Sequence, residues 1–223
     1  MIPYHKIQTI YKRNDKGKIL VGEYSLPEIE YLKDNQWQWR EKLDGTNIRI
    51  GHTPAFMVPD SIQNSFEIKG RTNKAIVPKH LLEGIQKLNL TTSLLETFPK
   101  TQVTLYGEGI GPKIQKRGKF YRDDHSFVLF DVKIGSFWLK QQDVEHVAAK
   151  LGIDYAPIIG TGTIAEAIAL VSNTNGIPSA LGQSWNRPNF QAEGLICVPQ
   201  VRLFDGTGKR IITKIKRVDF FCE

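Results

Sequence analysis

Cysteine is scarce in this sequence, and so are long apolar runs. Its two cysteines, Cys197 and Cys222, form neither a Cys-x-x-Cys pair nor the Cys/His spacing of a zinc site. No apolar run approaches the roughly 18 residues that cross a bilayer, and the first residues lack the apolar segment of a secretory signal. These absences argue against a membrane-spanning protein, and they favour a reduced, cytoplasmic setting.

Repeats and low-complexity tracts are also missing, which argues against collagen, coiled coil and wholesale disorder. Hydrophobic residues make up 40% of the 223-residue chain and charged residues 24%, as in an ordinary folded domain. The length predicts one domain over residues 1–223 with no internal linker. The net charge of +7 permits a polyanionic partner without proving one.

Short apolar runs bounded by Gly, Pro and Asn predict many strands. The clearest strands cover residues 37–44, 46–51, 102–109, 127–134, 193–199 and 210–218. Helical periodicity predicts helices at 79–88, 141–151 and 164–171. Thr163 and Glu166 have capping-box spacing at the start of the third helix, and Asn175-Gly176 is its predicted end. Residues 52–63 and 109–122 are predicted loops. Because helices and strands do not alternate regularly, the fold class is predicted as α+β with mostly antiparallel sheet.

The sharpest chemical signal is the segment EKLDGTN at positions 41–47. Lys42 ends a predicted strand, Gly45 supplies freedom for a tight turn, and a second strand follows. A lysine in such a position becomes a nucleophile when burial or nearby cations favour its neutral form. The alternative is an ordinary hairpin with a solvated lysine, since so short a motif also occurs by chance.

Four further motifs follow in a fixed order, and together with EKLDGTN they carry a family resemblance. The motif EKLDGTN resembles motif I of the covalent nucleotidyltransferases, the superfamily of polynucleotide ligases and mRNA capping enzymes. The later segments resemble motifs III, IIIa, IV and V of that superfamily: LYGEG at 105–109, FVLFD at 127–131, AEGLI at 192–196 and TKIKR at 213–217. The resemblance implies a nucleotidyltransferase fold with antiparallel sheets flanking an ATP cleft.

Asn47 indicates the branch of the superfamily. DNA ligases and capping enzymes usually carry arginine at this position, whereas asparagine is typical of RNA ligases such as the phage double-strand nick-sealing type. The segments KGRT at 69–72 and YHKIQTI at 4–10 resemble the same branch. The resemblance implies an ATP-dependent RNA ligase that joins 5′-phosphate and 3′-hydroxyl ends through a lysyl-AMP intermediate. Its expected partner is RNA rather than DNA, and its expected place is the cytoplasm, that of the host if the protein is phage-encoded.

Three alternatives to an RNA ligase stay open at this point. They are an ATP-dependent DNA ligase, an mRNA capping guanylyltransferase, and a nucleotide- or RNA-binding module without turnover. The chain ends six residues after Arg217, whereas relatives of these classes add an OB-fold or a small accessory domain after motif V. We therefore expect the catalytic domain alone, with no C-terminal OB or accessory domain.

The resemblance implies a role for each motif residue. Lys42 attacks the α-phosphate of ATP and releases pyrophosphate. Lys214 and Lys216 lie two apart and so share one strand face, where both bind phosphate and assist catalysis. A solvated edge strand with outward charges is the alternative for that pair.

Carboxylates and an aromatic ring complete the implied ATP site. Glu193 holds Mg²⁺ or Mn²⁺, usually through water, and Glu108 binds the ribose hydroxyl; the alternative for either is an exposed strand end. Phe130 packs against adenine, with Phe127 as the fallback. Strand alternation groups Phe130 with Val128 and Val132, so core packing is the competing interpretation.

The remaining candidates surround the phosphates. Asp44 and Asn47 contact the metal-bound phosphate waters, although both residue types are ordinary turn formers. Glu41 joins the nucleotide-binding set, and the fork of Arg71 suits a phosphate, unless Arg71 is a solvated loop cation. A cationic run lies within residues 113–122 and is a candidate grip on a nucleic-acid backbone. Asp123 and Asp124 offset part of its charge, and a mobile solvated loop is the alternative.

Overall fold

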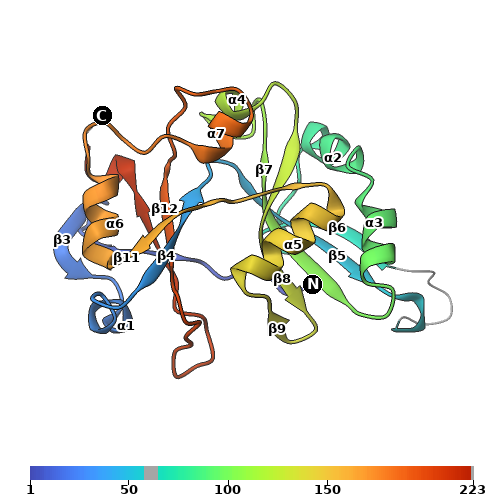
Figure 1. Ribbon diagram of the computed structural model, residues 1–223, viewed down its shortest axis with the longest axis horizontal. Helices are drawn as coiled ribbons and strands as arrows, with labels where there is room; N and C mark the ends of the chain where they lie inside the picture. Colours follow the sequence, from blue (N-terminus) through green and yellow to red (C-terminus); the bar gives the residue numbers. More distant parts are fainter. Residues whose placement is uncertain (58–64, 222–223) are drawn as a thin grey trace. The chain divides into compact units, whose positions relative to one another are not determined.

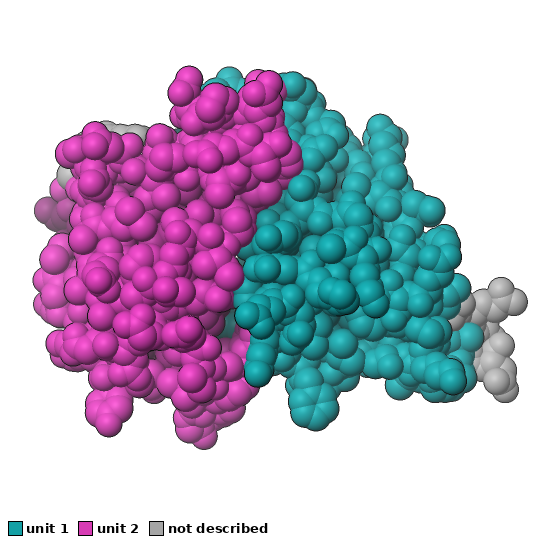
Figure 2. All heavy atoms as spheres, in the orientation of Figure 1, with its two compact units in different colours: residues 1–5, 44–156 teal, residues 6–43, 157–223 magenta. Residues whose placement is uncertain are grey.

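The computed structural model describes residues 1–57 and 65–221. The chain forms two compact units (Figure 2). Unit 1 comprises Met1–His5 and Asp44–Ala156, and unit 2 comprises Lys6–Leu43 and Pro157–Glu223. Each unit is organised around its own β-sheet (Figure 1).

Unit 2 contains a five-stranded sheet. The order of its strands is β1 (Gln8–Thr9), β13 (Thr213–Lys216), β12 (Gly194–Pro199), β4 (Trp37–Lys42) and β11 (Ile158–Gly162). All neighbours are antiparallel except β1 and β13. A separate pair is formed by β2 (Tyr11–Arg13) and β3 (Ile19–Tyr24), and the helical elements are α1 (Pro27–Tyr31), α6 (Ile164–Val171), α7 (Ala180–Ser184) and the 3₁₀ turn η2 (Arg217–Asp219).

One face of this sheet packs against helix α6 and the other carries cations. Helix α6 packs on β12 and β13, and its Ile164 and Val171 join Leu195 and Ile215 in a fully buried cluster. Side chains alternate along a strand, so the neighbours of these apolar residues project from the opposite face. Lys214 and Lys216, the neighbours of Ile215 on β13, therefore project from that opposite face.

Unit 1 contains a six-stranded sheet. The path runs β10 (Asp154–Tyr155), β8 (Ser126–Ile134), β7 (Val103–Ile110), β5 (Thr46–Thr53) and β6 (Ser65–Gly70), with β9 (Phe137–Trp138) also paired to β8. The pairs are antiparallel except β10 with β8. The helical elements are η1 (Ala55–Met57), α2 (Lys79–Gln86), α3 (Leu90–Thr97), α4 (Gly118–Tyr121) and α5 (Gln141–Leu151).

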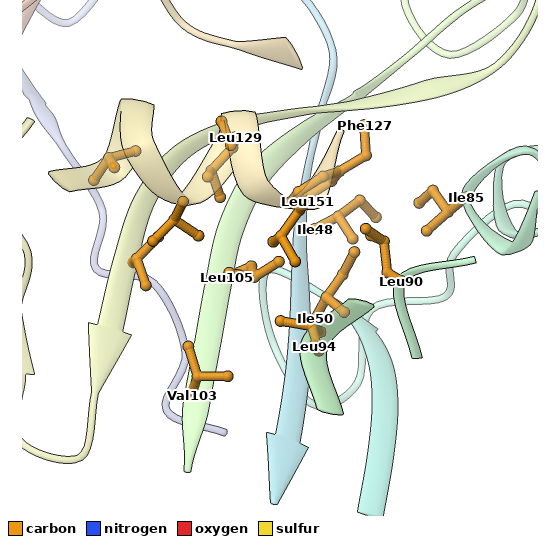
Figure 3. Packing of buried hydrophobic residues seen from close by; sticks show 14 of the residues in the cluster. Ile48, Ile50, Ile85, Leu90, Leu94, Val103, Leu105, Phe127, Leu129 and Leu151 are labelled. Carbon is orange, nitrogen blue, oxygen red and sulfur yellow. The ribbon is translucent and has the colours of Figure 1, made fainter. Parts of the chain in front are cut away.

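The core of unit 1 forms where helices cover one face of this sheet. Figure 3 shows Ile48, Ile50 and Leu105 from the strands packed with Ile85 and Leu94 from the helices. All five side chains are at most 1% exposed. Because side chains alternate along a strand, Asn47 on β5 and Glu108 on β7 lie on the opposite face of the sheet from this core.

The predicted α+β class with mostly antiparallel sheet is confirmed. Helices α5 and α6 have the predicted bounds, and the capping box is present: the Glu166 amide donates to Thr163 Oγ1 (3.3 Å) and the Thr163 amide donates to Glu166 Oε2 (2.7 Å). The predicted end at Asn175-Gly176 is wrong, because α6 ends at Val171. Among the described residues, no helix has the length and apolar character needed to span a membrane.

Two predicted loops are partly wrong. Strand β5 continues through Thr53, and the short turn η1 follows it; positions 58–63 lie outside the described residues. Strand β7 continues to Ile110, and α4 interrupts the second predicted loop. The hairpin alternative for the EKLDGTN segment is wrong as well, since β4 and β5 belong to different sheets.

Candidate active site

Strand β12 lies between the two lysine-bearing strands of unit 2. Its first residue, Gly194, pairs with Lys42 on β4 and with Lys216 on β13. This register places Glu193, one residue earlier, between the two lysine side chains. Lys42 Nζ lies 2.5 Å from Glu193 Oε2, and Lys216 Nζ lies 2.9 Å from Glu193 Oε1. One carboxylate therefore bridges the predicted nucleophile and a predicted phosphate-binding lysine.

The cluster is only partly open to solvent. The side chains of Lys42 and Glu193 are 17% and 13% exposed, so the alternative of a solvated lysine does not describe Lys42. Burial acts to raise the pKa of Glu193, but the charges and hydrogen bonds of Lys42 and Lys216 outweigh it and hold that pKa below its usual value. Burial, followed by the charges of Lys216 and Lys42, lowers the pKa of Lys214. Lys42, Lys214 and Lys216 thus gather around the Glu193 carboxylate.

Gly194 allows the strands to approach this closely. Its φ is +157°, and a Cβ at this position would collide with the carbonyl oxygen of Ile215. The backbone around it is bonded on both sides: the Glu193 amide donates to the Lys42 carbonyl (3.3 Å), and the Arg217 amide donates to the Glu193 carbonyl (3.0 Å). The Glu-Gly pair of the predicted motif IV therefore has a steric as well as an electrostatic basis.

Glu41 projects from the opposite face to Lys42, and it is 1% exposed. Ser179 Oγ donates to Glu41 Oε1 (2.5 Å), and the Leu181 amide donates to Glu41 Oε2 (3.2 Å). Ser179 also caps α7 by accepting from the Gly182 amide. These contacts attach α7 to β4. The sequence placed Glu41 in the nucleotide-binding set and did not predict this structural role.

In unit 1, Asn47 and Glu108 are cross-strand partners on β5 and β7. The Oδ1 atom of Asn47 is buried and has no hydrogen-bond partner among the described residues. An orphan buried oxygen is costly unless a ligand satisfies it. The observation fits the predicted contact of Asn47 with a metal or its waters, because such ions prefer oxygen ligands.

Gly45 matters for its size rather than for conformational freedom. Its φ lies outside the left-handed region, but a Cβ would collide with the Gly109 carbonyl oxygen and would lie 2.7 Å from Glu108 Cγ. Next to it, the Asp44 amide donates to the hydroxyl of Tyr121 (3.1 Å), a residue that is fully buried. The turn of motif I is therefore packed against β7 and α4, and Tyr121 is a contact that the sequence motifs did not indicate.

Phe130 occupies a β-bulge. Tyr106 pairs with Asp131 and Gly107 with Leu129, so Phe130 is the extra residue. Beyond a bulge the alternation of side chains is inverted, and Val132 consequently shares the buried core with Leu129. The predicted grouping of Phe130 with Val132 is wrong for this reason.

The two candidate aromatic residues lie on opposite faces of β8, because they are three positions apart on the strand. Phe130 is partly exposed, and the ring of Tyr4 meets it edge-on at a centroid distance of 5.1 Å. The Tyr4 hydroxyl donates to Asp131 Oδ2 (2.5 Å) beside it. Phe127, the fallback, is fully buried in the core (Figure 3), where a ligand has no access.

Arg71 lies just after β6 and is exposed. Its neighbour Lys69 on the strand is paired with Glu67 at 2.9 Å. The placement suits either a phosphate contact or the solvated cation considered above, and the predicted role of Arg71 remains a prediction.

The donor set fits a divalent ion bound chiefly by water and phosphate. Among the described residues, no three His, Cys, Asp or Glu side chains converge as a metal cage. Mg²⁺ usually takes one or two protein ligands, several waters and the substrate phosphates, so a single carboxylate such as Glu193 is enough. Its two oxygens are presently bonded to lysines, which a divalent ion would have to displace or reach through water.

Comparison with known proteins identifies the family. The RNA ligase family model matches residues 35–216, and the chain therefore belongs to the RNA ligase family. No curated protein matches the sequence.

Solved structures of a Naegleria gruberi RNA ligase have a similar fold. A variant with ATP and Mn has a TM-score of 0.65 at 16% identity, covering 96% of this chain and 56% of that one. A variant with AMP and Mn has a TM-score of 0.59 at 16% identity, with coverages of 94% and 60%. The structure with PPi has a TM-score of 0.60 at 18% identity, with coverages of 96% and 61%. This chain thus spans about three fifths of the chains it matches.

Proposed function

We propose that this protein is an ATP-dependent RNA ligase that works through a lysyl-AMP intermediate on Lys42. The observation that carries the proposal is the bridge from Glu193 to Lys42 and Lys216, made by three strands that hold motifs I, IV and V. A solvated lysine would show no such arrangement. Membership of the RNA ligase family and the Asn47 signature favour RNA over DNA as substrate.

In the first step, Lys42 Nζ forms a bond to the α-phosphorus of ATP while the bond to pyrophosphate breaks. Nζ must have lost a proton before its lone pair can attack. Glu193 accepts the hydrogen bond from Nζ and so orients it, and Lys214 and Lys216 supply positive charge for the phosphate oxygens. A divalent ion bound at Glu193 would neutralise further charge on the phosphates.

Two further steps would complete sealing. AMP passes from Lys42 to the 5′-phosphate of an RNA strand, and a 3′-hydroxyl then attacks that phosphate and expels AMP. In unit 1, Glu108, Asn47 and Phe130 supply the ribose, metal and adenine contacts implied by the family motifs. The reaction would proceed in the cytoplasm, and nick repair is the type of task that the phage-like signature favours.

The direct test is incubation with α-labelled ATP and Mg²⁺ or Mn²⁺, followed by denaturation and detection of label on the protein. We expect label from ATP but not from GTP, which separates a ligase from a capping enzyme. Lys42→Ala and Lys42→Arg should both remain unlabelled. Arginine keeps a cation opposite Glu193 but stays protonated, so it controls for loss of the ion pair.

Sealing is measured next on nicked RNA and nicked DNA duplexes with 5′-phosphate ends. Faster joining of RNA supports the proposal, and faster joining of DNA identifies a DNA ligase. Persistent labelling of the Lys42 variants would refute the assignment of the nucleophile. Nucleotide binding without any label would leave only the binding-module alternative.

A further inference from the structure

The segment that connects β7 to β8, residues 111–125, concentrates positive charge in unit 1. It contains five cations and two carboxylates, which leaves a net charge of +3 out of +7 for the whole chain. No acidic residue occurs between Ile110 and Arg122. We call these fifteen residues the connecting segment.

The strand register places the connecting segment beside the nucleotide-binding candidates of unit 1. The final pair of β7 and β8 is Ile110 with Ser126, so the segment leaves the sheet directly after motif III. At the same end of the sheet, β5 begins with Thr46 opposite Gly109. The segment therefore starts within three residues of Glu108.

The connecting segment is anchored to unit 1 at several points. Tyr121 is fully buried with its hydroxyl on the Asp44 amide, and Ile114 packs against the core. His125 Nε2 lies 2.8 Å from the Pro112 carbonyl oxygen. A Cβ on Gly118 would collide with the carbonyl oxygen of Gly111. These contacts determine which side chains face inward and which face solvent.

The acidic residues leave three lysines of the segment uncompensated. Arg122 binds both oxygens of Asp124 (2.6 and 3.0 Å) and also Asp154 (3.2 Å), so the charge of Asp124 is directed at Arg122. Lys113, Lys116 and Lys119 are exposed, and none of the three forms an ion pair with any residue of 1–57 or 65–221.

An apolar ring is exposed among these lysines. Phe120 is 49% exposed, and the ammonium of Lys119 lies 5.1 Å from the centre of its ring. Exposed aromatic rings within cationic surfaces are the typical platforms on which unpaired bases stack, while the cations bind the backbone phosphates.

We propose that Lys113, Lys116, Lys119 and Phe120 form a docking surface for the RNA strand that the enzyme seals. The lysines bind backbone phosphates, and the ring of Phe120 stacks on a base that is unpaired at the strand end. The inference rests on the proposed ligase function, since that function supplies the RNA. It adds a polymer-binding surface that is separate from the residues assigned to ATP.

The test compares two triple variants that lose the same charge. The first replaces Lys113, Lys116 and Lys119 by serine. The matched control replaces by serine three other exposed lysines that lie outside the connecting segment, Lys16, Lys100 and Lys140. Phe120→Ala is the third variant. Binding of a nicked RNA duplex with one unpaired base at the nick is measured over a range of salt concentrations, alongside self-adenylylation and sealing of a pre-adenylylated nick.

We expect the segment triple variant to bind RNA about tenfold or more weakly at physiological salt. Its plot of log affinity against log salt should be shallower by about two to three, because each lost phosphate contact changes that slope by about 0.7 to 0.9. Phe120→Ala should weaken binding about fivefold or more without changing the slope, since stacking releases no counterions. Self-adenylylation should stay within about twofold of the wild type in both.

Equal RNA binding by the two triple variants would overturn the docking surface. So would a loss of self-adenylylation in the segment variant that matches its loss of RNA binding. Failure of the proposed function looks different, because the wild-type protein would then form no lysyl-AMP whether or not the segment binds RNA. The proposal would also be refuted if the wild-type protein bound an acidic polypeptide through this segment in preference to RNA.

Discussion

Glu193 bonds Lys42 directly: Nζ and Oε2 lie 2.5 Å apart, and the other oxygen of the same carboxylate is bonded to Lys216. The carboxylate thus sets the position of the amine that attacks the α-phosphorus in the proposed reaction. It is also the group best suited to hold a divalent ion in unit 2. These two tasks compete for the same oxygens, so ATP and metal binding should loosen the Lys42–Glu193 bond.

Substitution of Glu193 should abolish most of the self-adenylylation. We expect Glu193→Gln to slow labelling by about 10²-fold or more, because it loses the charge that orients Lys42 and attracts the metal. Glu193→Asp should rescue poorly, since its shorter side chain cannot reach both lysines. The measurement is the initial rate of labelling across a Mg²⁺ titration.

Glu67→Gln is the matched control, because Glu67 forms a more exposed pair with Lys69. It should label at the wild-type rate. If Glu193→Gln did the same at every Mg²⁺ concentration, Glu193 would have neither role.

Acid should remove a stabilising contribution from Glu193. Its folded pKa is lower than its ordinary value of 4.5, so the contribution is present above pH 4.5 and is lost as the pH falls through the folded pKa. We expect wild type to be more stable than Glu193→Gln at pH 7, and the difference to shrink as the pH falls below 4.5. Urea unfolding of both proteins at each pH measures it. A difference that grew on acidification would contradict the predicted direction of the pKa shift.

Phe130 and Phe127 should respond differently to alanine. Phe130→Ala should remain folded and raise the KM for ATP about fivefold, because an aromatic contact contributes about 1 kcal/mol. Phe127→Ala should instead lower the free energy of unfolding by about 3 to 5 kcal/mol, as removal of a fully buried ring does. Thermal unfolding and ATP titration of the two variants distinguish them. If Phe130→Ala were the less stable protein, the assignment of Phe127 to the core and of Phe130 to a ligand contact would be wrong.

Gly45→Ala should disturb the turn of motif I. The added methyl group meets the Gly109 carbonyl and Glu108, so we expect a loss of about 1 to 3 kcal/mol in stability and slower adenylylation. Gly206→Ala is the control, because a Cβ there meets nothing within 4 Å, and it should change stability by less than about 0.5 kcal/mol. Chemical denaturation gives both values; equal stability of the two variants would contradict the steric argument.

Local sequence determined much of this protein. The periodicity of residues 141–151 and 164–171 defined two helices to the residue, because a run of buried side chains at helical spacing has few alternatives. The ordered motifs predicted the RNA ligase family, which the family match confirms, and they singled out Lys42, Glu193 and Lys216, which the structure brings together. Alternation along TKIK correctly placed Lys214 and Lys216 on one strand face.

Tertiary structure decided the features that depend on contacts between segments, which the sequence of a single strand does not specify. The extra residue at Phe130 depends on pairing between β7 and β8, and it brings Val132 rather than Asp131 into the core beside Leu129. The hydrogen bond from Ser179 to Glu41 joins residues 138 positions apart, and the hydrogen bond between Asp44 and Tyr121 joins residues 77 positions apart. Such contacts arise only when distant segments pack together, because burial and hydrogen-bond satisfaction act through space rather than along the chain.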